Sequence, residues 1–138
     1  MFRWVEHTGE LELELESASA EELFAEALAA LSELFGDVSP WPGGSEPRDQ
    51  DEMRETTVRA SDRPALLAAW LDELVFLAET EGFVPEAVES LDLDELELRA
   101  RIRGRLGDAP HLVKAVTYPQ LAVGRTNGAW RGRVVLDV

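Results

Sequence analysis

Leucine and glutamate alternate strictly near the start of the chain. Leu11, Leu13 and Leu15 are each followed by a glutamate, and this period of two places the leucines on one face of a strand and the carboxylates on the other. The alternation returns over residues 96–103, where apolar positions alternate with one glutamate and three arginines. Both segments are therefore predicted to be strands with one buried and one solvated face.

Apolar residues that recur every three to four positions predict two helices. The first covers about 20–34, with Ser19 as its N-cap and acidic residues in its first turn. The second begins after Ser61 or Asp62 and ends near Gly82, and a broad apolar stripe runs along it. Each helix is thus expected to bury one face against a sheet.

Further strands are predicted over 53–60, 112–118, 121–125 and 130–138. Asn127-Gly128 is a strong hairpin signal between the last two, whereas residues 83–88 fit no single pattern and the Pro- and Gly-rich segment 40–49 forms the longest loop. The predicted fold class is α+β: a single domain, residues 1–138, with two helices packed on a mainly antiparallel or mixed β-sheet.

Composition narrows the possible functions. The 138 residues are 45% hydrophobic, which is enough for one core, and 13 basic against 28 acidic side chains give a net charge of −15. Such a charge gives no attraction to nucleic acid or to an anionic membrane. Without cysteine, a metal would have to be held by oxygen or histidine ligands. No apolar run is long enough to cross a bilayer, so we expect a soluble, cytoplasmic protein.

Charge is distributed unevenly along the chain. Residues 1–36 hold nine acids and one base, whereas residues 99–138 hold eight bases and two acids. Opposite charges on neighbouring strands stabilise a sheet. We therefore hypothesise that the two charged strands lie side by side and that their side chains pair: Glu12, Glu14 and Glu16 with Arg99, Arg101, Arg103 and Arg105.

Few residues suggest catalysis, because the chain has no glycine-rich phosphate loop, no nucleophile elbow and no zinc-protease motif. Three carboxylates are the candidates for a site: Glu10, Asp37 and Asp137. Each also has a simpler interpretation, since Glu10 continues the solvated row of glutamates, Asp37 suits a turn, and Asp137 at the end of an apolar strand is either a solvated end residue or part of a polar site.

Four other side chains are ambiguous from the sequence. His7 is either a functional residue or a partly buried imidazole whose partner is a neighbouring acid or the backbone, and His111 suits a turn. Lys114, within an apolar strand, points either to solvent or to a carboxylate site. Trp41, between two prolines, either anchors the loop or contacts a partner.

Five segments resemble the archease family. EHTGE at 6–10 resembles the family's EHTAD, VKAVTY at 113–118 its VKAVTYH, and WRGRVVLD at 130–137 its closing W-x-x-x-VVxDI strand. The segment 36–39 is similar to the family's MTDTS, and the helix at 66–77 is similar to its LLxxWLNELLYL. Together these matches span the whole chain in the family's order.

The resemblance implies an accessory protein rather than an enzyme. Archeases assist the RtcB-type RNA ligase, which uses GTP and a divalent metal in tRNA splicing and RNA repair, and they promote its guanylylation and multiple turnover. By position, the family's metal-binding acids fall on Glu10, Asp37 and Asp137, while His7 and Lys114 match motif residues. Oxygen ligands suit Ca²⁺ first, with Mg²⁺ or Mn²⁺ as alternatives.

Two departures from the family pattern concern the candidate site. Glu10 replaces the family's aspartate and adds one methylene, and Pro119 stands where the family often has histidine. Two other functions remain open: an acidic protein-binding or chaperone-like module with no metal role, which would use the acidic face and Trp41, and an independent metal-dependent hydrolase.

Overall fold

The computed structural model describes residues 1–36, 51–109 and 113–138. Two helices and seven strands follow one another along these segments: β1 (Phe2–His7), β2 (Glu10–Ser17), α1 (Ala20–Phe35), β3 (Asp51–Arg59), α2 (Arg63–Thr80), β4 (Phe83–Leu93), β5 (Glu97–Leu106), β6 (Ala115–Thr126) and β7 (Ala129–Asp137).

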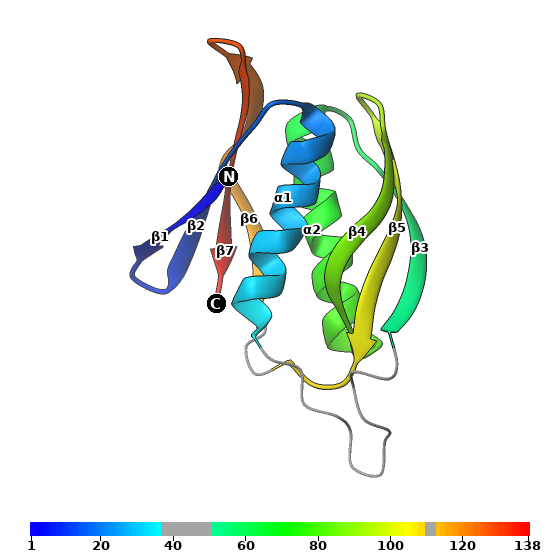
Figure 1. Ribbon diagram of the computed structural model, residues 1–138. Helices are drawn as coiled ribbons and strands as arrows, with labels where there is room; N and C mark the ends of the chain where they lie inside the picture. The colour runs from blue at the N-terminus through cyan, green and yellow to red at the C-terminus, as the bar shows by residue number, and fades with distance from the viewer. Residues whose placement is uncertain (37–50, 110–112) are drawn as a thin grey trace.

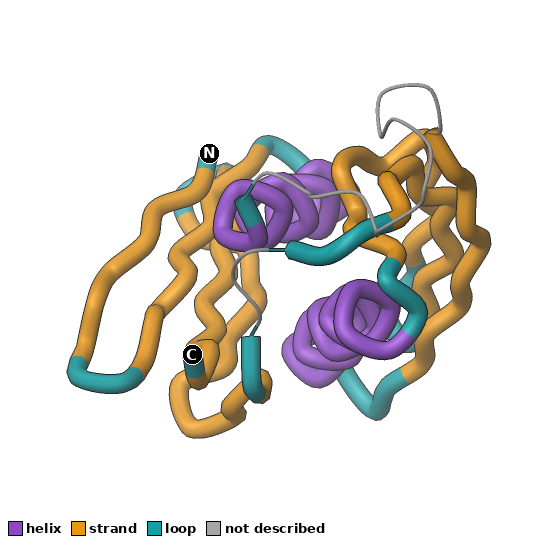
Figure 2. Tube along the Cα trace, turned by 90° about the horizontal axis from the view of Figure 1, so that it is seen from below, coloured by secondary structure: helices purple, strands orange, loops and turns teal. Residues whose placement is uncertain are grey.

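The strands form two antiparallel sheets with both helices between them. One sheet has the order β1-β2-β7-β6, and the other has the order β3-β5-β4. Figures 1 and 2 show α1 and α2 sandwiched between the sheets. The predicted α+β class with two helices is confirmed, and the strands are divided between two sheets rather than gathered in one.

Helix α1 begins and ends as its sequence predicts. The Ser19 Oγ accepts a hydrogen bond from the backbone N–H of Glu22 at 3.1 Å, which satisfies one of the free donors at the helix start. Gly36 follows the last turn with φ of 79°, a left-handed conformation that glycine adopts without strain. The helix buries an apolar face made of Leu23, Phe24, Ala27, Leu28 and Leu31.

Helix α2 is capped by Asp62 rather than by Ser61. The Asp62 carboxylate accepts from the backbone N–H of Ala65 at 2.8 Å. In the middle of the helix, fully buried Trp70 donates its indole N–H to the backbone oxygen of Phe24 in α1 at 2.9 Å. A buried hydrogen bond therefore joins the middle of α2 to the N-terminal part of α1, in addition to the apolar packing between the helices.

The strand boundaries differ from the prediction in three places. Residues 2–7 form β1, which the sequence analysis did not predict, and the ambiguous segment 83–88 belongs to β4. The two strands predicted over 112–118 and 121–125 are replaced by one strand, β6, which begins at Ala115 and has a register shift between Thr117 and Ala122. Proline is tolerated there because β6 lies at the edge of the sheet. The predicted hairpin is confirmed: Asn127 and Gly128 both have positive φ between β6 and β7.

The hypothesis that the glutamates of β2 pair with the arginines of β5 is wrong. Strand β2 lies between β1 and β7 in one sheet, whereas β5 is the central strand of the other sheet. Three of the four arginines of β5 pair with acids of their own sheet: Arg99 with Glu97, Arg103 with Glu89 and Arg105 with Glu86. Overall charge asymmetry thus failed to identify the neighbouring strand, because each sheet contains residues of both signs.

The contacts of Glu97 with two arginines lead to a prediction about how stability depends on pH. Hydrogen bonds from the Nε atoms of Arg59 and Arg99, at 2.6 and 2.9 Å, lower the pKa of Glu97. A depressed folded-state pKa stabilises the fold above the unfolded-state value, and this contribution is lost as the pH falls through the folded-state pKa. We expect Arg59→Gln to raise the pKa of Glu97 toward its ordinary value in a carboxyl NMR titration. Arg131→Gln, in the other sheet, should leave it unchanged, and an equal shift in both variants would contradict the assignment.

Candidate metal centre

Two of the predicted site carboxylates lie directly opposite each other on neighbouring strands. Glu10 at the start of β2 is the register partner of Asp137 at the end of β7. The same row continues to His7 on β1 and to Ala115 on β6, so it crosses all four strands at one end of the sheet. Residues directly opposite in an antiparallel pair have Cβ atoms about 4.5–5.5 Å apart, close enough for both carboxylates to contact one ion.

The pattern of leucine and valine explains why both carboxylates share a face. Leu13 pairs in register with Val134, and both belong to the core that packs against the helices. Leu11 pairs with core residue Leu136 and, two residues before Leu13, lies on the same face of the strand. Because side chains alternate along a strand, the intervening Glu10 and its partner project from the opposite face. Glu10 is exposed there and its partner aspartate is half-buried. The hydrophobic core therefore fixes the position of the pair.

Opposed carboxylates suit a hard cation. Like charges directly opposite on a sheet are destabilising, and a divalent ion between them would remove the repulsion while receiving the oxygen ligands that Ca²⁺, Mg²⁺ and Mn²⁺ prefer. Within the described segments, no three His, Asp or Glu side chains are grouped to hold a metal. The pair Glu10 and Asp137 thus fits a cation as two donors, and further donors have to come from elsewhere.

The third predicted ligand, Asp37, lies outside the described residues, as do Trp41 and His111. Helix α1 ends at Phe35, immediately before this segment. Figure 1 shows that end of α1 at the same end of the molecule as the C-terminus of the chain. The chain therefore enters the segment that contains Asp37 at the end of the molecule where the carboxylate pair lies.

The two motif residues beside the pair, His7 and Lys114, both have exposed side chains. His7 is exposed, so its interpretation as a partly buried imidazole is wrong. The side chain of Lys114 is also exposed, but its backbone N–H donates to the backbone oxygen of Asp137 at 2.8 Å. The backbone of Lys114 thus holds the backbone of Asp137, one of the two candidate ligands, in place.

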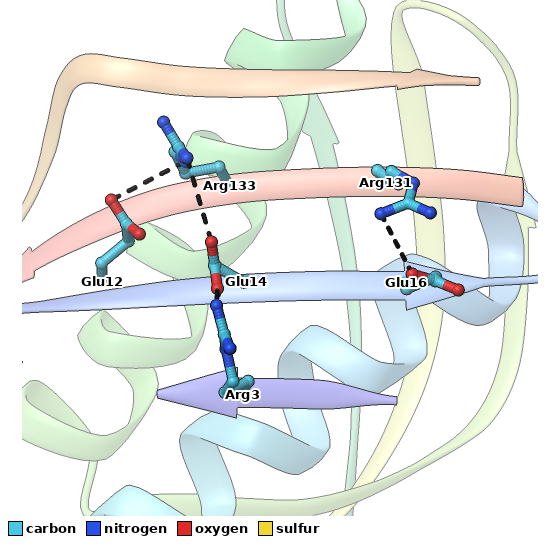
Figure 3. Close-up of polar contacts among 6 residues, drawn as sticks. All are labelled: Arg3, Glu12, Glu14, Glu16, Arg131 and Arg133. Carbon is cyan, nitrogen blue, oxygen red and sulfur yellow. Dashed lines mark hydrogen bonds and ion pairs between the residues drawn. The ribbon is translucent and has the colours of Figure 1, made fainter. Parts of the chain in front are cut away.

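A network of ion pairs continues along the same face, away from the candidate site. Figure 3 shows Arg133 between two glutamates of β2, with its Nε 3.7 Å from Glu12 and its Nη2 3.8 Å from Glu14. Arg3 on β1 also pairs with Glu14, and Arg131 pairs with the last glutamate of the row at 3.2 Å. These are not the arginines of β5 that the charge distribution predicts as partners. Alternation on the C-terminal hairpin strand was the signal that could have identified Arg131 and Arg133.

The sequence matches a known protein family over nearly its whole length. The model of the Archease protein family matches residues 2–138, nearly the whole chain. The chain belongs to the archease family. The resemblance in the sequence motifs is thereby confirmed, and membership implies an accessory role beside a partner rather than an enzymatic one.

Curated archeases match over almost their full length. The archease of Methanosarcina barkeri is 27% identical over 146 aligned positions, which cover 99% of this chain and 95% of the relative. The archease of Pyrobaculum islandicum is 30% identical with the same coverage. This archease is thus similar to its relatives over the whole domain, not only in the motifs.

Solved structures agree with the fold. The solution structure of Methanobacterium thermoautotrophicum protein 1598 is 25% identical and superimposes with a TM-score of 0.69, covering 99% of this chain and 98% of that one. The crystal structure of a Thermotoga maritima archease, described as a possible chaperone, has a TM-score of 0.67 at 22% identity and covers 100% of this chain and 98% of that one. In the described part of the present chain, neither helix is long and apolar enough to span a membrane.

Proposed function

We propose that this archease is a cytoplasmic protein cofactor of an RtcB-type, GTP-dependent RNA ligase. It promotes guanylylation and multiple turnover of the ligase in tRNA splicing and RNA repair, and it acts through a carboxylate-bound divalent metal. The opposed register positions of Glu10 and Asp137 carry the proposal, because two family-motif acids far apart in the sequence meet on one face of the sheet. Oxygen donors suit Ca²⁺, Mg²⁺ and Mn²⁺ alike, and Ca²⁺ is the ion that we propose first.

The roles of the residues follow from their positions. Glu10 and Asp137 supply two carboxylate donors, Asp37 is the proposed third, and the Lys114 N–H holds the backbone of β7 in place beside them. A bound cation would supply positive charge that attracts phosphate or carboxylate oxygens at the contact with the ligase. His7, the exposed register partner of Glu10 on β1, is a motif residue that could face the ligase beside the site.

The strong net negative charge supports a protein partner. A net charge of −15 disfavours direct contact with RNA, so the ligase makes the RNA contacts in this proposal. The same charge accelerates encounter with a basic RNA-binding enzyme, and this acceleration weakens as the salt concentration rises.

A guanylylation assay with the cognate ligase tests the proposal. We expect the wild-type protein to accelerate formation of the ligase–GMP adduct, and Asp137→Asn and Glu10→Gln each to reduce that acceleration about tenfold or more, because losing a carboxylate ligand weakens the metal site. Glu95→Gln is the matched control, since it removes an exposed carboxylate from the turn between β4 and β5 of the other sheet. If Asp137→Asn accelerates formation of the ligase–GMP adduct as much as the wild type does, and circular dichroism shows that it is folded, the site does not act through a bound metal.

The alternative, an acidic protein-binding or chaperone-like module, receives less support from the surface. That function would use the glutamates of β2, but Glu12, Glu14 and Glu16 each have an arginine partner on the same sheet. A charge reversal of all three that weakens ligase binding, together with a silent Asp137→Asn, would favour the alternative.

A further inference from the structure

Glu12 is an unusual residue on the face that carries the candidate metal centre. It lies two residues after Glu10 on β2, on the same side of the strand, and its register partner is Val135. Among the buried polar and charged residues of the described segments it stands alone, with a side chain only 8% exposed. A buried carboxylate needs a positive partner or hydrogen-bond donors to offset the loss of water.

Arg133 is the partner that Glu12 has. Its Nε lies 3.7 Å from a Glu12 oxygen, and its other end lies 3.8 Å from Glu14. Glu14 has a second cation, Arg3, on the opposite side. Within the described part of the chain, Glu12 has Arg133 as its one ion-pair partner (Figure 3). Removing this arginine would therefore leave Glu14 paired and Glu12 unpaired.

Glu12 is also within reach of the carboxylate pair. Diagonal neighbours in an antiparallel sheet are about 7–8 Å apart, a gap that a glutamate side chain helps to span. Glu12 is the diagonal neighbour of Asp137 and lies two residues after Glu10 on the same side of β2. In the described segments these three carboxylates are not grouped to hold a metal, and Glu12 is paired with Arg133.

We infer that Arg133 sets the cation affinity of the Glu10–Asp137 pair by holding Glu12 out of it. The inference rests on the proposed metal role of that pair. While Arg133 neutralises Glu12, a divalent cation finds two sheet carboxylates, Glu10 and Asp137, and takes its remaining ligands from water or from a protein partner. Without Arg133, Glu12 becomes an additional carboxylate ligand.

Titration with Mn²⁺, followed by the EPR signal of the free ion, tests the inference. We expect Arg133→Gln to bind Mn²⁺ about tenfold more tightly than the wild type, because it gains a charged oxygen ligand and loses a nearby positive charge. Arg131→Gln is the matched control: it removes the same charge from the same face of β7, but its partner is Glu16 at the far end of the row. It should change the affinity by no more than about twofold, because exposed charges at that distance are screened.

Two double variants separate ligation from net charge. Arg133→Gln combined with Glu12→Gln should return to about wild-type affinity, whereas Arg133→Gln combined with Glu16→Gln should stay about tenfold tighter, although both have the same net charge. Arg133→Lys retains the positive charge and should bind about as the wild type does. Thermal melting of each variant, with the wild type alongside, shows whether it is folded under the titration conditions.

Each result of the Mn²⁺ titrations either supports or overturns the inference about Arg133. Tight binding in Arg133→Gln that depends on Glu12 supports the inference, even where the wild type binds too weakly to detect; in that case the metal role proposed for the natural protein fails separately. Binding by the wild type with no gain in Arg133→Gln overturns the inference and leaves the proposed function standing. An equal gain in Arg131→Gln, or no binding in any folded variant, also overturns it.

Discussion

Trp70→Ala is expected to lower the free energy of unfolding by about 3–5 kcal/mol, the usual cost of truncating a large buried aromatic side chain. Trp70 is the largest of the fully buried side chains in the described segments, and it lies at the centre of α2. Its loss would leave a cavity between the helices and would remove the hydrogen bond to the Phe24 oxygen. Urea denaturation followed by far-ultraviolet circular dichroism measures the change.

Two further variants separate the contributions to this loss. Trp70→Phe keeps much of the apolar contact but removes the indole donor, so it should cost less than the alanine variant. Phe76→Ala on the same helix is the control, because Phe76 is 47% exposed and its truncation should change stability by no more than about 0.5 kcal/mol. A loss below about 1 kcal/mol for Trp70→Ala would contradict this account of the core, since truncations in packed cores cost more.

Gly104→Ala is expected to destabilise the three-stranded sheet. A Cβ atom at this position of β5 would lie 2.4 Å from the backbone oxygen of Val84 and 2.7 Å from a ring carbon of Phe83. Both contacts are far inside van der Waals distance, and the Val84 oxygen belongs to the backbone of the adjacent strand, so it cannot rotate away. Overpacking of this kind costs about 1–3 kcal/mol or more in a well-packed core.

Gly124→Ala is the control for Gly104→Ala. Gly124 lies in β6, and nothing is within 4 Å of the position that its Cβ would occupy. The change should leave stability equal or raise it by up to about 1 kcal/mol, because alanine loses less conformational freedom on folding than glycine. Equal midpoints for the two variants in urea would show that the close approach at Gly104 is relaxed by movement of β4.

Local sequence patterns predicted most of the secondary structure. The strict alternation at residues 11–15 and 96–103 placed β2 and β5 correctly, because one face of each strand is buried in the core. Ser19 marked the start of α1, and Asn127-Gly128 marked the last hairpin. These signals come from short-range geometry that is encoded within a few residues.

The grouping of strands into two sheets was not predictable from the same patterns. Strand β5 has the alternation of a half-buried strand in either sheet, so its pattern does not identify its neighbour. The predicted strands 112–118 and 121–125 left a gap at Pro119 and Gln120, and only the sheet order shows that β6 is an edge strand, in which proline is tolerated. Partner choice depends on the packing of distant segments against the helices.

The candidate site was predictable in part. The sequence motifs identified Glu10 and Asp137, and the register places them opposite each other. The role of Arg133 was not visible in the sequence, because its contact with Glu12 depends on β2 and β7 being neighbours. The ligand role of Glu10 and Asp137, and that of Asp37, remains a prediction for the binding experiments.

The antiparallel register of β2 and β7 has a consequence for protein engineering. Because side chains repeat every two residues, an opposed pair of carboxylates can be moved along these strands only in steps of two. The next equivalent position is Glu12 opposite Val135, so a single Val135→Asp substitution would create a second copy of the arrangement beside the first. The spacing of metal ligands introduced on this sheet is therefore set by the two-residue repeat of the strands and not by the design of loops.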